Sequence, residues 1–281
     1  MEIISSCSQI QQTCMQARQS GRTLALVPTM GYFHDGHLSL MRWAREYCDM
    51  LVVSLFVNPA QFGPGEDYQR YPQDLDNDVH AAMEEGVDIL FTPARSSLYP
   101  DGFSTWVEVQ GLSGKLCGLT RPEHFRGVTT VVCKLFNLTC PHKAVFGQKD
   151  WQQLIIIKKM TRDLNMPVEI VGRPTVREDD GLAMSSRNAY LDQELRKVAP
   201  RVYQGLLMVR GRFESGQDDR LELELELRSY YQRNLPQAEI DYVQIVDSNN
   251  LEPQDRVKPG ALAAVALKLG QARLIDNILL D

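Results

Sequence analysis

Two histidines three residues apart, His34 and His37, lie in a turn whose composition suits anion binding. Gly31 and Gly36 belong to the same turn, an apolar run precedes it, and amphipathic spacing begins at Leu38. This pattern predicts a strand, a turn and the start of a helix. The first turn of a helix has unpaired N–H groups and partial positive charge, and glycine lets the backbone approach a phosphate while imidazoles add donors. The turn is therefore a candidate phosphate site, and a tight loop with two solvated histidines is the plainer interpretation.

A metal ion is the other ligand that a pair of histidines could bind. No third cysteine, histidine or acidic ligand follows this pair at a recognisable spacing. The six cysteines are scattered and form no Cys-x-x-Cys pair, which fits reduced thiols in a cytosolic protein. We therefore rank a metal below a phosphate at His34 and His37.

Polar residues also follow two other apolar runs, at 58–61 and at 147–153. Because ligands of open α/β sheets bind at the carboxyl ends of the strands, these clusters and the turn at 28–37 should share one edge. A fourth candidate is the loop 184–187, whose hydroxyls and guanidinium match phosphate oxygens. Taken singly, each cluster could be a solvated turn or a surface ion pair of little energetic value.

Segments with strand character alternate with helical segments over residues 1–175. A doubly wound parallel sheet is the fold class that such alternation predicts. The expected strands are residues 23–27, 51–57, 87–92, 144–146 and 168–171 with an edge strand at 104–110, and the expected helices are 6–19, 38–47, 74–86, 128–138 and 151–164.

The composition changes near residue 175, where we place a boundary before a smaller α+β domain at 176–281. A helix capped by Asp192 should follow the polar loop. The run 221–227 alternates Leu and Glu with period two, but both are good helix formers and Glu is a poor strand former, so we expect a helix. Residues 239–247, 261–269 and 272–280 are expected to be strands of an antiparallel sheet.

Charge and composition narrow the choice of partner. The chain has 281 residues, 43% of them hydrophobic and 23% charged, which is ordinary for a soluble globular protein. A net charge of −6 argues against broad binding to nucleic acid or to anionic membranes. No basic segment leads into an apolar one near the N-terminus, and no apolar run approaches membrane-spanning length. We expect a cytoplasmic protein whose partners are small molecules, with no nucleic acid and no membrane among them.

A family resemblance becomes specific when six blocks are read together. They are residues 28–31 (Pro-Thr-Met-Gly), 34–37 (His-Asp-Gly-His), 56–62 (Phe-Val-Asn-Pro-Ala-Gln-Phe), 125–128 (Phe-Arg-Gly-Val), 146–153 (Phe-Gly-Gln-Lys-Asp-Trp-Gln-Gln) and 184–188 (Met-Ser-Ser-Arg-Asn). The His-x-Gly-His block alone suggests only the wider nucleotidylyltransferase superfamily. Together the blocks closely resemble the pantothenate synthetases (pantoate–β-alanine ligases), in order through nearly all of residues 20–192 and more loosely to the end.

The resemblance implies an activity, a fold and an assembly. The carboxylate of (R)-pantoate would attack the α-phosphate of ATP to give pantoyl adenylate and diphosphate, and the amine of β-alanine would then release AMP. Residues 1–175 would form a Rossmann-like domain that binds ATP and pantoate, and 176–281 a smaller domain that closes over ATP. Mg²⁺ would accompany the nucleotide, and the enzyme would be a cytosolic homodimer.

The resemblance also implies which residues make up the site. The catalytic residues would be His34, His37, Lys149, Ser185, Ser186 and Arg187, which are the donor types that phosphoryl displacement needs. The ATP site would comprise Met30, Gly31, Tyr32, Phe33, His34, Asp35, Gly36, His37, Gly147, Gln148, Lys149, Asp150, Val176, Met184, Ser185, Ser186 and Arg187. Gln61 and Gln153 would hold pantoate, with Gln61 also meeting β-alanine and with Asn58 and Arg126 as weaker members. Asp76 and Asp78 would be Mg²⁺ contacts.

This chain departs from the family pattern at two positions, with Gln148 where Glu is usual and Trp151 where Tyr is usual. Losing a carboxylate beside Lys149 should leave that lysine freer to meet phosphate. Two rival functions share the motifs. Another adenylyl-transferring enzyme would not need the pair of Gln61 and Gln153, and a non-catalytic nucleotide-binding module would show no turnover.

Overall fold

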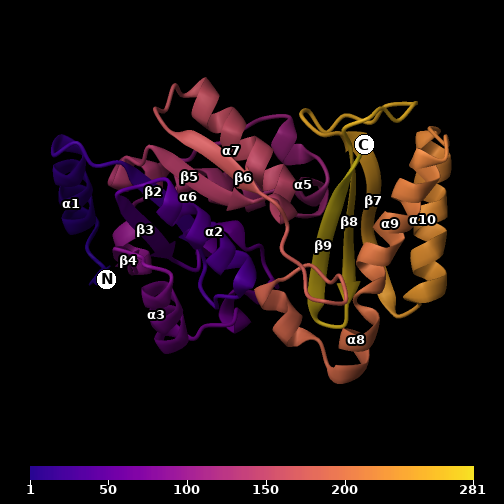
Figure 1. Cartoon of the computed structure of the whole chain (residues 1–281), viewed down its shortest axis with the longest axis horizontal. Coiled ribbons are helices and arrows are strands. Elements are labelled where there is room, and N and C mark those ends of the chain that lie inside the picture. The colour runs from indigo at the N-terminus through magenta and orange to yellow at the C-terminus, as the bar shows by residue number, and fades with distance from the viewer. The chain divides into compact units, whose positions relative to one another are not determined.

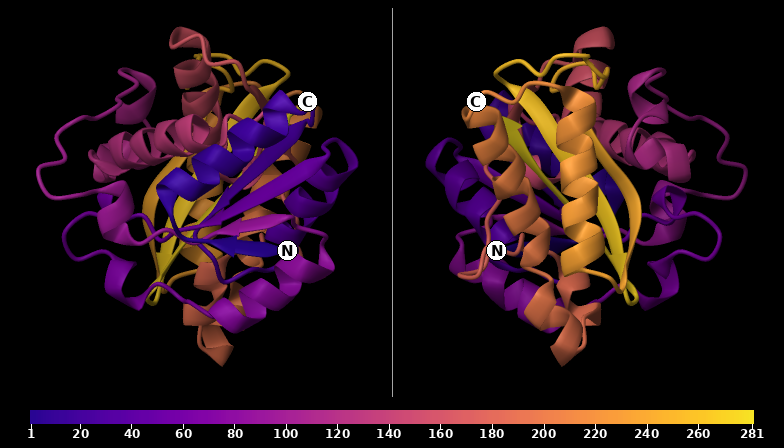
Figure 2. Two further views of the ribbon diagram at one scale, coloured as in Figure 1. Left: turned by 90° about the vertical axis from the view of Figure 1, so that its left-hand side faces the viewer. Right: turned by 90° about the vertical axis from the view of Figure 1, so that its right-hand side faces the viewer.

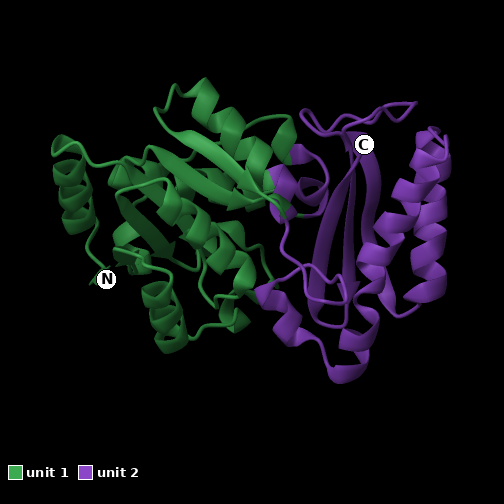
Figure 3. Ribbon diagram, viewed as in Figure 1, with its two compact units in different colours: residues 1–113, 121–148, 153–174 green, residues 114–120, 149–152, 175–281 purple.

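The computed structural model describes residues 1–281, which form two compact units (Figure 3). The first unit comprises Met1–Ser113, Arg121–Gln148 and Gln153–Pro174. The second comprises Gly114–Thr120, Lys149–Gln152 and Thr175–Asp281. No helix in the structure combines the length and the hydrophobicity that crossing a bilayer requires.

A six-stranded parallel sheet forms the centre of the first unit (Figure 1). Its strands are β1 (Glu2–Ile4), β2 (Leu24–Thr29), β3 (Met50–Leu55), β4 (Ile89–Phe91), β5 (Lys143–Gly147) and β6 (Glu169–Arg173), in the order β1-β4-β3-β2-β5-β6. Pairing of β2 with β3 is continuous from Leu24 opposite Met50 to Thr29 opposite Leu55. The predicted Rossmann-like doubly wound sheet is confirmed.

Helices and short 3₁₀ turns connect these strands. The helices are α1 (Cys7–Gln19), α2 (Asp35–Glu46), α3 (Leu75–Glu84), α4 (Arg95–Leu98), α6 (His124–Thr139) and α7 (Trp151–Asp163), and the 3₁₀ turns are η1 (Pro59–Gln61), η2 (Asp67–Arg70), η3 (Leu112–Gly114) and η4 (Gln148–Asp150).

Both faces of the central strands are buried, which explains their almost continuous apolar sequence. Ala25 and Val27 of β2 pack in one core cluster with Met41 of α2. Leu24 and Leu26, which point to the opposite face, are also fully buried. Helices α1 and α6 pack on each other and contact β2, so helices enclose this part of the sheet.

The second unit contains an antiparallel sheet and its covering helices. The strands are β7 (Ala238–Asp247), β8 (Ala261–Leu269) and β9 (Ala272–Leu280), in that order, and the helices are α5 (Cys117–Thr120), α8 (Gln193–Val198), α9 (Arg201–Glu214) and α10 (Arg220–Asn234), with the 3₁₀ turn η5 (Ser186–Tyr190). The right-hand view of Figure 2 shows α9 and α10 lying over the strands. Tyr231 is fully buried there, and its hydroxyl donates to the backbone oxygen of Val202 at 2.7 Å.

The run of alternating Leu and Glu is helical, as its composition predicted. It lies within α10, whose N-cap Asp219 accepts a hydrogen bond from the backbone N–H of Glu222. Leu223 and Leu227 face the core, whereas Leu221 and Leu225 are among the exposed hydrophobic residues of the chain. The helix predicted after Asp192 is also confirmed, since the side chain of Asp192 caps α8.

The edge strand predicted at 104–110 is wrong. Residues 103–109 form no strand, because the backbone of Val107 pairs with side chains and not with a neighbouring strand. The N–H of Val107 donates to the hydroxyl of Thr130 at 3.0 Å, and its carbonyl accepts from the hydroxyl of Thr129 at 2.6 Å. The helix predicted at 128–138 also differs at its start, since α6 already begins at His124.

Candidate active site

Two of the predicted polar clusters follow adjacent strands. The histidine turn follows β2 and the segment 58–61 follows β3, while β5, on the other side of β2, ends at Gly147 (Figure 1). Because the strands are parallel, their carboxyl ends lie at one edge of the sheet. The sequence prediction that these strand ends share an edge is confirmed.

The side chains of both histidines accept hydrogen bonds from the backbone at the start of α2. His34 is the N-cap residue, and its Nδ1 accepts the backbone N–H of Gly36 at 3.1 Å. Nδ1 of His37 accepts the backbone N–H of His34 at 3.5 Å, which completes a reciprocal capping box. The two rings are tilted by 37° with centroids 4.1 Å apart.

These contacts favour one tautomer of each imidazole. A ring nitrogen that accepts a backbone N–H cannot carry a proton, so the neutral rings carry their protons on Nε2. His34 and His37 are therefore Nε2–H donors, which is the form that can donate to a phosphate oxygen.

The backbone before the first histidine bonds to a carboxylate of α3. The N–H of Tyr32 donates to Oδ2 of Asp78 at 2.8 Å, and the N–H of Phe33 donates to Oδ1 at 2.6 Å. Burial raises the pKa of Asp78, and these two hydrogen bonds act against that shift. Two backbone donors of the predicted phosphate turn are thus already engaged.

The amide groups of Asn58 and Gln61 lie together after β3. Nδ2 of Asn58 donates to Oε1 of Gln61 at 3.0 Å and to the carbonyl of Gly127 at 3.1 Å. Asn58 is only 1% exposed, so its conformation is set by packing as well as by these bonds. Gly127 belongs to α6, and a Cβ atom there would lie 2.2 Å from the carbonyl oxygen of Ala60.

Two side chains of the segment 121–124 hold the backbone of Gln61. Nη2 of Arg121 donates to its carbonyl at 3.2 Å, and Nδ1 of His124 lies 2.8 Å from the same oxygen. Arg121 also makes a two-point ion pair with Glu66. Burial raises the pKa of Glu66, but the hydrogen bonds and charge of Arg121 outweigh it and hold that pKa below its ordinary value. The pair therefore stabilises the fold at neutral pH and is lost in acid.

The other two predicted substrate residues also belong to the first unit. The guanidinium of Arg126 lies 5.0 Å from the ring centroid of Trp106 and pairs with Glu123. Gln153 is half-buried in the first turn of α7. No hydrogen bond joins Arg126 or Gln153 to Asn58 or Gln61.

The segment Lys149–Gln152 is anchored within the second unit by its own backbone and side chains. The carbonyl of Lys149 accepts from Nδ2 of Asn277 at 2.8 Å, and Nε1 of Trp151 donates to the carbonyl of Ser248 at 2.8 Å. Lys149 is half-buried and makes no ion pair, and Asp150 is exposed. The tryptophan that departs from the family pattern thus keeps a polar partner for its ring nitrogen.

The loop that carries the hydroxyl and guanidinium cluster is built on a short hairpin. Arg177 bridges to Ala183, and the N–H of Met184 donates to the carbonyl of Val176 at 3.0 Å. Ser185 caps η5 by accepting the backbone N–H of Arg187 at 3.3 Å, while Ser186 is buried. The cap engages the Ser185 hydroxyl oxygen as an acceptor, so its O–H remains a donor.

A buried ion pair fixes the base of this hairpin. Arg177 donates to both oxygens of Asp276, at 2.7 and 2.9 Å, and its guanidinium lies 3.5 Å from the centroid of the Tyr203 ring. The side chain of Asp276 is 3% exposed and that of Arg177 is 17% exposed. The pair thus holds the backbone that carries Val176 and the loop 184–187.

We expect Asp276→Ala to lower the free energy of unfolding by about 3–5 kcal/mol, because it leaves the Arg177 charge buried without its partner. Urea unfolding followed by circular dichroism measures the loss. The double variant Arg177→Met, Asp276→Leu removes both charges and should be more stable than Asp276→Ala alone. A loss below about 1 kcal/mol for the single variant would show that solvent already screens the pair.

The predicted magnesium contacts lie on different sides of α3. Asp76 is exposed, whereas Asp78 is 2% exposed and bonds to the turn. Residues two apart on a helix do not face each other, so the two carboxylates cannot share one ion. Nowhere in the structure do three or more histidine, cysteine or acidic side chains gather as a metal site, and all six cysteines are free.

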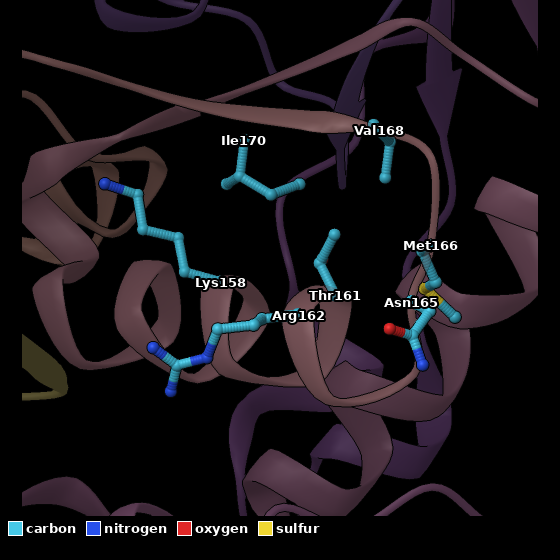
Figure 4. Close-up of a pocket in the computed structure, with 7 residues that line it drawn as sticks. All are labelled: Lys158, Thr161, Arg162, Asn165, Met166, Val168 and Ile170. Atoms are coloured by element: carbon cyan, nitrogen blue, oxygen red, sulfur yellow. The ribbon is translucent and has the colours of Figure 1, made fainter.

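A surface pocket of about 500 Å³ lies elsewhere in the first unit. Its lining comes from the end of α7, the loop that follows and the start of β6, including Lys158, Arg162 and Ile170 (Figure 4). The amino end of β6 is opposite to the sheet edge at which the polar clusters gather. We therefore assign this pocket no part in the candidate site.

Sequence reasoning missed the residues that position the predicted ones. Asp78 was predicted as a metal contact, and Arg121, His124 and Asn277 were not singled out. Motif spacing could not reveal these partners, because each bonds to a backbone atom far away in the sequence. The only signal was local: an acidic residue in the first turns of a predicted helix.

Comparisons with known proteins agree with this architecture over the full chain. Residues 2–279 match the model of the pantoate-beta-alanine ligase family. A pantothenate synthetase of Nitratidesulfovibrio vulgaris (strain DSM 19637 / Miyazaki F) is 55% identical over 280 residues, covering 100% of this chain and 99% of the relative. One from Oleidesulfovibrio alaskensis is 53% identical, with 100% of both chains covered.

Solved structures give the same result. The pantothenate synthetase of Thermus thermophilus superposes with a TM-score of 0.94 at 45% identity, covering 100% of this chain and 99% of that one. A pantoate-beta-alanine ligase of Francisella tularensis, solved in complex with beta-gamma ATP and beta-alanine, gives a TM-score of 0.81 at 33% identity, with 99% and 97% covered. The resemblance seen in the six sequence blocks is confirmed. This chain therefore belongs to the pantoate–β-alanine ligase family.

Proposed function

We propose that this enzyme joins (R)-pantoate to β-alanine in two half-reactions driven by ATP. The observation that carries the proposal is the family match over residues 2–279. In the first half-reaction a pantoate carboxylate oxygen bonds to the α-phosphorus, and the bond from that phosphorus to the diphosphate oxygen breaks. In the second, the β-alanine nitrogen bonds to the acyl carbon, the bond from that carbon to the phosphate oxygen of AMP breaks, and the amine loses a proton.

The first half-reaction needs donors at the phosphates more than it needs a protein nucleophile. The Nε2–H groups of His34 and His37 would donate to phosphate oxygens on which charge builds up as diphosphate leaves. Their tautomer supports this role, since the backbone holds both Nδ1 atoms as acceptors. Fixed donors of this kind stabilise a transition state without reorganising during the reaction.

Further donors would come from the second unit. The Lys149 ammonium would neutralise phosphate charge, and the loop 184–187 would add hydroxyl and guanidinium donors. Asp150, which is exposed, would accept from the ribose hydroxyls, and Val176 would lie near the adenine. The remaining proposed ATP contacts are Met30, Gly31, Tyr32, Phe33, Asp35, Gly36, Gly147, Gln148, Met184, Ser185, Ser186 and Arg187.

Neutral amides would bind the acid substrate. Gln61 and Gln153 would bind the pantoate hydroxyls and carboxylate without adding charge, with Asn58 and Arg126 in support. The bond from Asn58 to Oε1 orients the Gln61 amide so that its NH₂ group points away from Asn58. Nε2 of Gln61 lies 3.1 Å from the Met30 sulfur, a weak acceptor that a substrate oxygen would readily replace.

Magnesium would enter this reaction with the nucleotide. The residues present do not fit a site built by the protein, because Asp78 is engaged by the turn and Asp76 faces another side of α3. Mg²⁺ commonly keeps several waters and binds through substrate phosphates. We propose that it reaches the enzyme on ATP, without direct ligands from the protein.

Residues 1–175 would bind ATP and pantoate, and residues 176–281 would act as the lid domain. The enzyme would work as a cytoplasmic homodimer, and sedimentation equilibrium would measure its assembly state.

The test of the function is pantoate-dependent exchange of labelled diphosphate into ATP. We expect exchange with (R)-pantoate and Mg²⁺ alone, and AMP release only after β-alanine is added. Exchange driven by another acid and not by pantoate would contradict the substrate assignment. Absence of exchange with every acid would favour a binding module without turnover.

A further inference from the structure

We propose that Asp78 is a positioning residue for ATP, whose carboxylate holds the histidine turn in its binding shape without touching any substrate. This inference rests on the proposed role of residues 31–37 in binding ATP phosphates. It assigns Asp78 a role different from the metal contact that the sequence suggested.

The geometry of the carboxylate supports the proposal. Each of its two oxygens accepts one backbone N–H, from Tyr32 at 2.8 Å and from Phe33 at 2.6 Å. These two residues immediately precede the N-cap His34. Asp78 therefore fixes the chain directly before the residue whose ring must be oriented toward phosphate.

The turn adopts a conformation that needs such support. Gly31 has φ +85° and Tyr32 has φ +55°. Tyrosine rarely adopts the left-handed region, because its Cβ approaches the backbone closely there. With positive φ at Gly31 and Tyr32, the N–H groups of Tyr32 and Phe33 point to one side, where the carboxylate of Asp78 accepts both.

Asp78 itself is rigidly placed. Its side chain is 2% exposed, and α3 is capped by Asp74, whose carbonyl accepts the N–H of Asp78 at 2.9 Å. The fit is close, since a Cβ at Gly31 would lie 2.9 Å from Oδ2 of Asp78. A metal ion would compete with both backbone donors for these oxygens, so the observed contacts favour the positioning role.

Asparagine is the informative substitution. It keeps the size of the side chain, but it replaces one acceptor oxygen by an NH₂ group that would face a backbone N–H. One hydrogen bond is lost and two donors oppose each other, so the turn must move. A displacement of about 1 Å can cost about 10²-fold in rate.

The experiment compares wild type, Asp78→Asn and the control Glu84→Gln, a substitution of an exposed carboxylate on the same helix. Initial rates give kcat/KM for ATP, KM for pantoate and the free Mg²⁺ needed for half-maximal rate, at a temperature at which all three proteins are folded. We expect Asp78→Asn to lower kcat/KM for ATP about 10- to 100-fold. KM for pantoate and the half-saturating Mg²⁺ should stay within about twofold of wild type, as should every parameter of Glu84→Gln.

Two outcomes would overturn the proposal. A lower melting temperature with unchanged ATP kinetics would mean that Asp78 only stabilises the fold. Activity restored by excess Mg²⁺, with a raised half-saturating concentration, would mean that Asp78 binds the metal. If wild type itself shows no pantoate-dependent exchange, the proposed function fails instead, so the two failures are distinguishable.

A second variant keeps the test valid should Asp78→Asn not fold. Gly31→Ala perturbs the same contact from the other partner, because its methyl would press on Oδ2 of Asp78. It should also lower kcat/KM for ATP and spare the Mg²⁺ requirement. ATP kinetics equal to wild type would count against the proposal.

Discussion

Replacing Lys149 by alanine should slow pantoyl adenylate formation about 10²- to 10³-fold, the loss that follows removal of one fixed donor to developing charge. The ammonium makes no ion pair in the structure, and Gln148 stands where the family usually has Glu, so no carboxylate holds the ammonium away from phosphate. The segment should keep its place, since Asn277 and Trp151 anchor it without using the Lys149 side chain. Pantoate-dependent exchange of diphosphate into ATP measures the effect.

The control for this substitution is Lys158→Ala. Lys158 is an exposed lysine on α7, so the variant loses the same charge away from the candidate site. It should exchange diphosphate at the wild-type rate, and both variants should melt at the wild-type temperature. Exchange by Lys149→Ala within about threefold of wild type would remove this lysine from the catalytic set.

The parallel sheet could be predicted because its central strands are buried on both faces. Burial on both sides requires continuous apolar runs, which are visible in the sequence at 24–27 and 51–57. The polar turns that follow such runs must then gather at one edge of the sheet. Helix formation by the Leu and Glu run in α10 was predictable too, since intrinsic propensity and tertiary packing agree there.

The prediction at 104–110 was wrong because alternation describes side-chain exposure and not backbone pairing. Val107 and Val109 are less exposed than their neighbours, as alternate residues of an edge strand would be, but the hydrogen-bond partners of the Val107 backbone are hydroxyls of α6. Nothing in the local sequence shows whether the backbone of such a segment bonds to a neighbouring strand or to side chains. The short strand β1 and the helix α9 were not expected at all.

In the candidate site, the residues that carry the chemistry could be predicted, whereas the residues that position them could not. Residues with donors, such as His34 and Lys149, could be chosen because phosphate chemistry needs them. The residues that position them could not be chosen in this way, because Asp78 and Arg121 bond to main-chain atoms of Tyr32 and Gln61, and main-chain atoms carry no sequence signature. Tertiary structure alone shows that Asp78 holds a turn.

Replacing Gly127 by alanine should destabilise the protein and weaken pantoate binding together. The added methyl would lie 2.2 Å from the carbonyl oxygen of Ala60 and 2.6 Å from the N atom of Gln61, both backbone atoms that cannot rotate away. Overpacking of this kind costs about 1–3 kcal/mol, which exceeds the gain of up to about 1 kcal/mol from alanine in a helix. Because the turn that carries Gln61 must move, we also expect KM for pantoate to rise about 10-fold. Urea unfolding and initial rates measure the two effects.

The control is Gly211→Ala, a substitution of a glycine in helix α9 whose added methyl would meet no atom within 4 Å. Alanine should stabilise this helix by about 0.5–1 kcal/mol and leave KM for pantoate unchanged. The two variants thus make the same chemical change in a helix with opposite expected signs, and only the approach of the 58–61 turn to α6 accounts for the difference. If Gly127→Ala were as stable as wild type with normal pantoate kinetics, then α6 could shift without moving Gln61, and the close packing would not set the position of that amide.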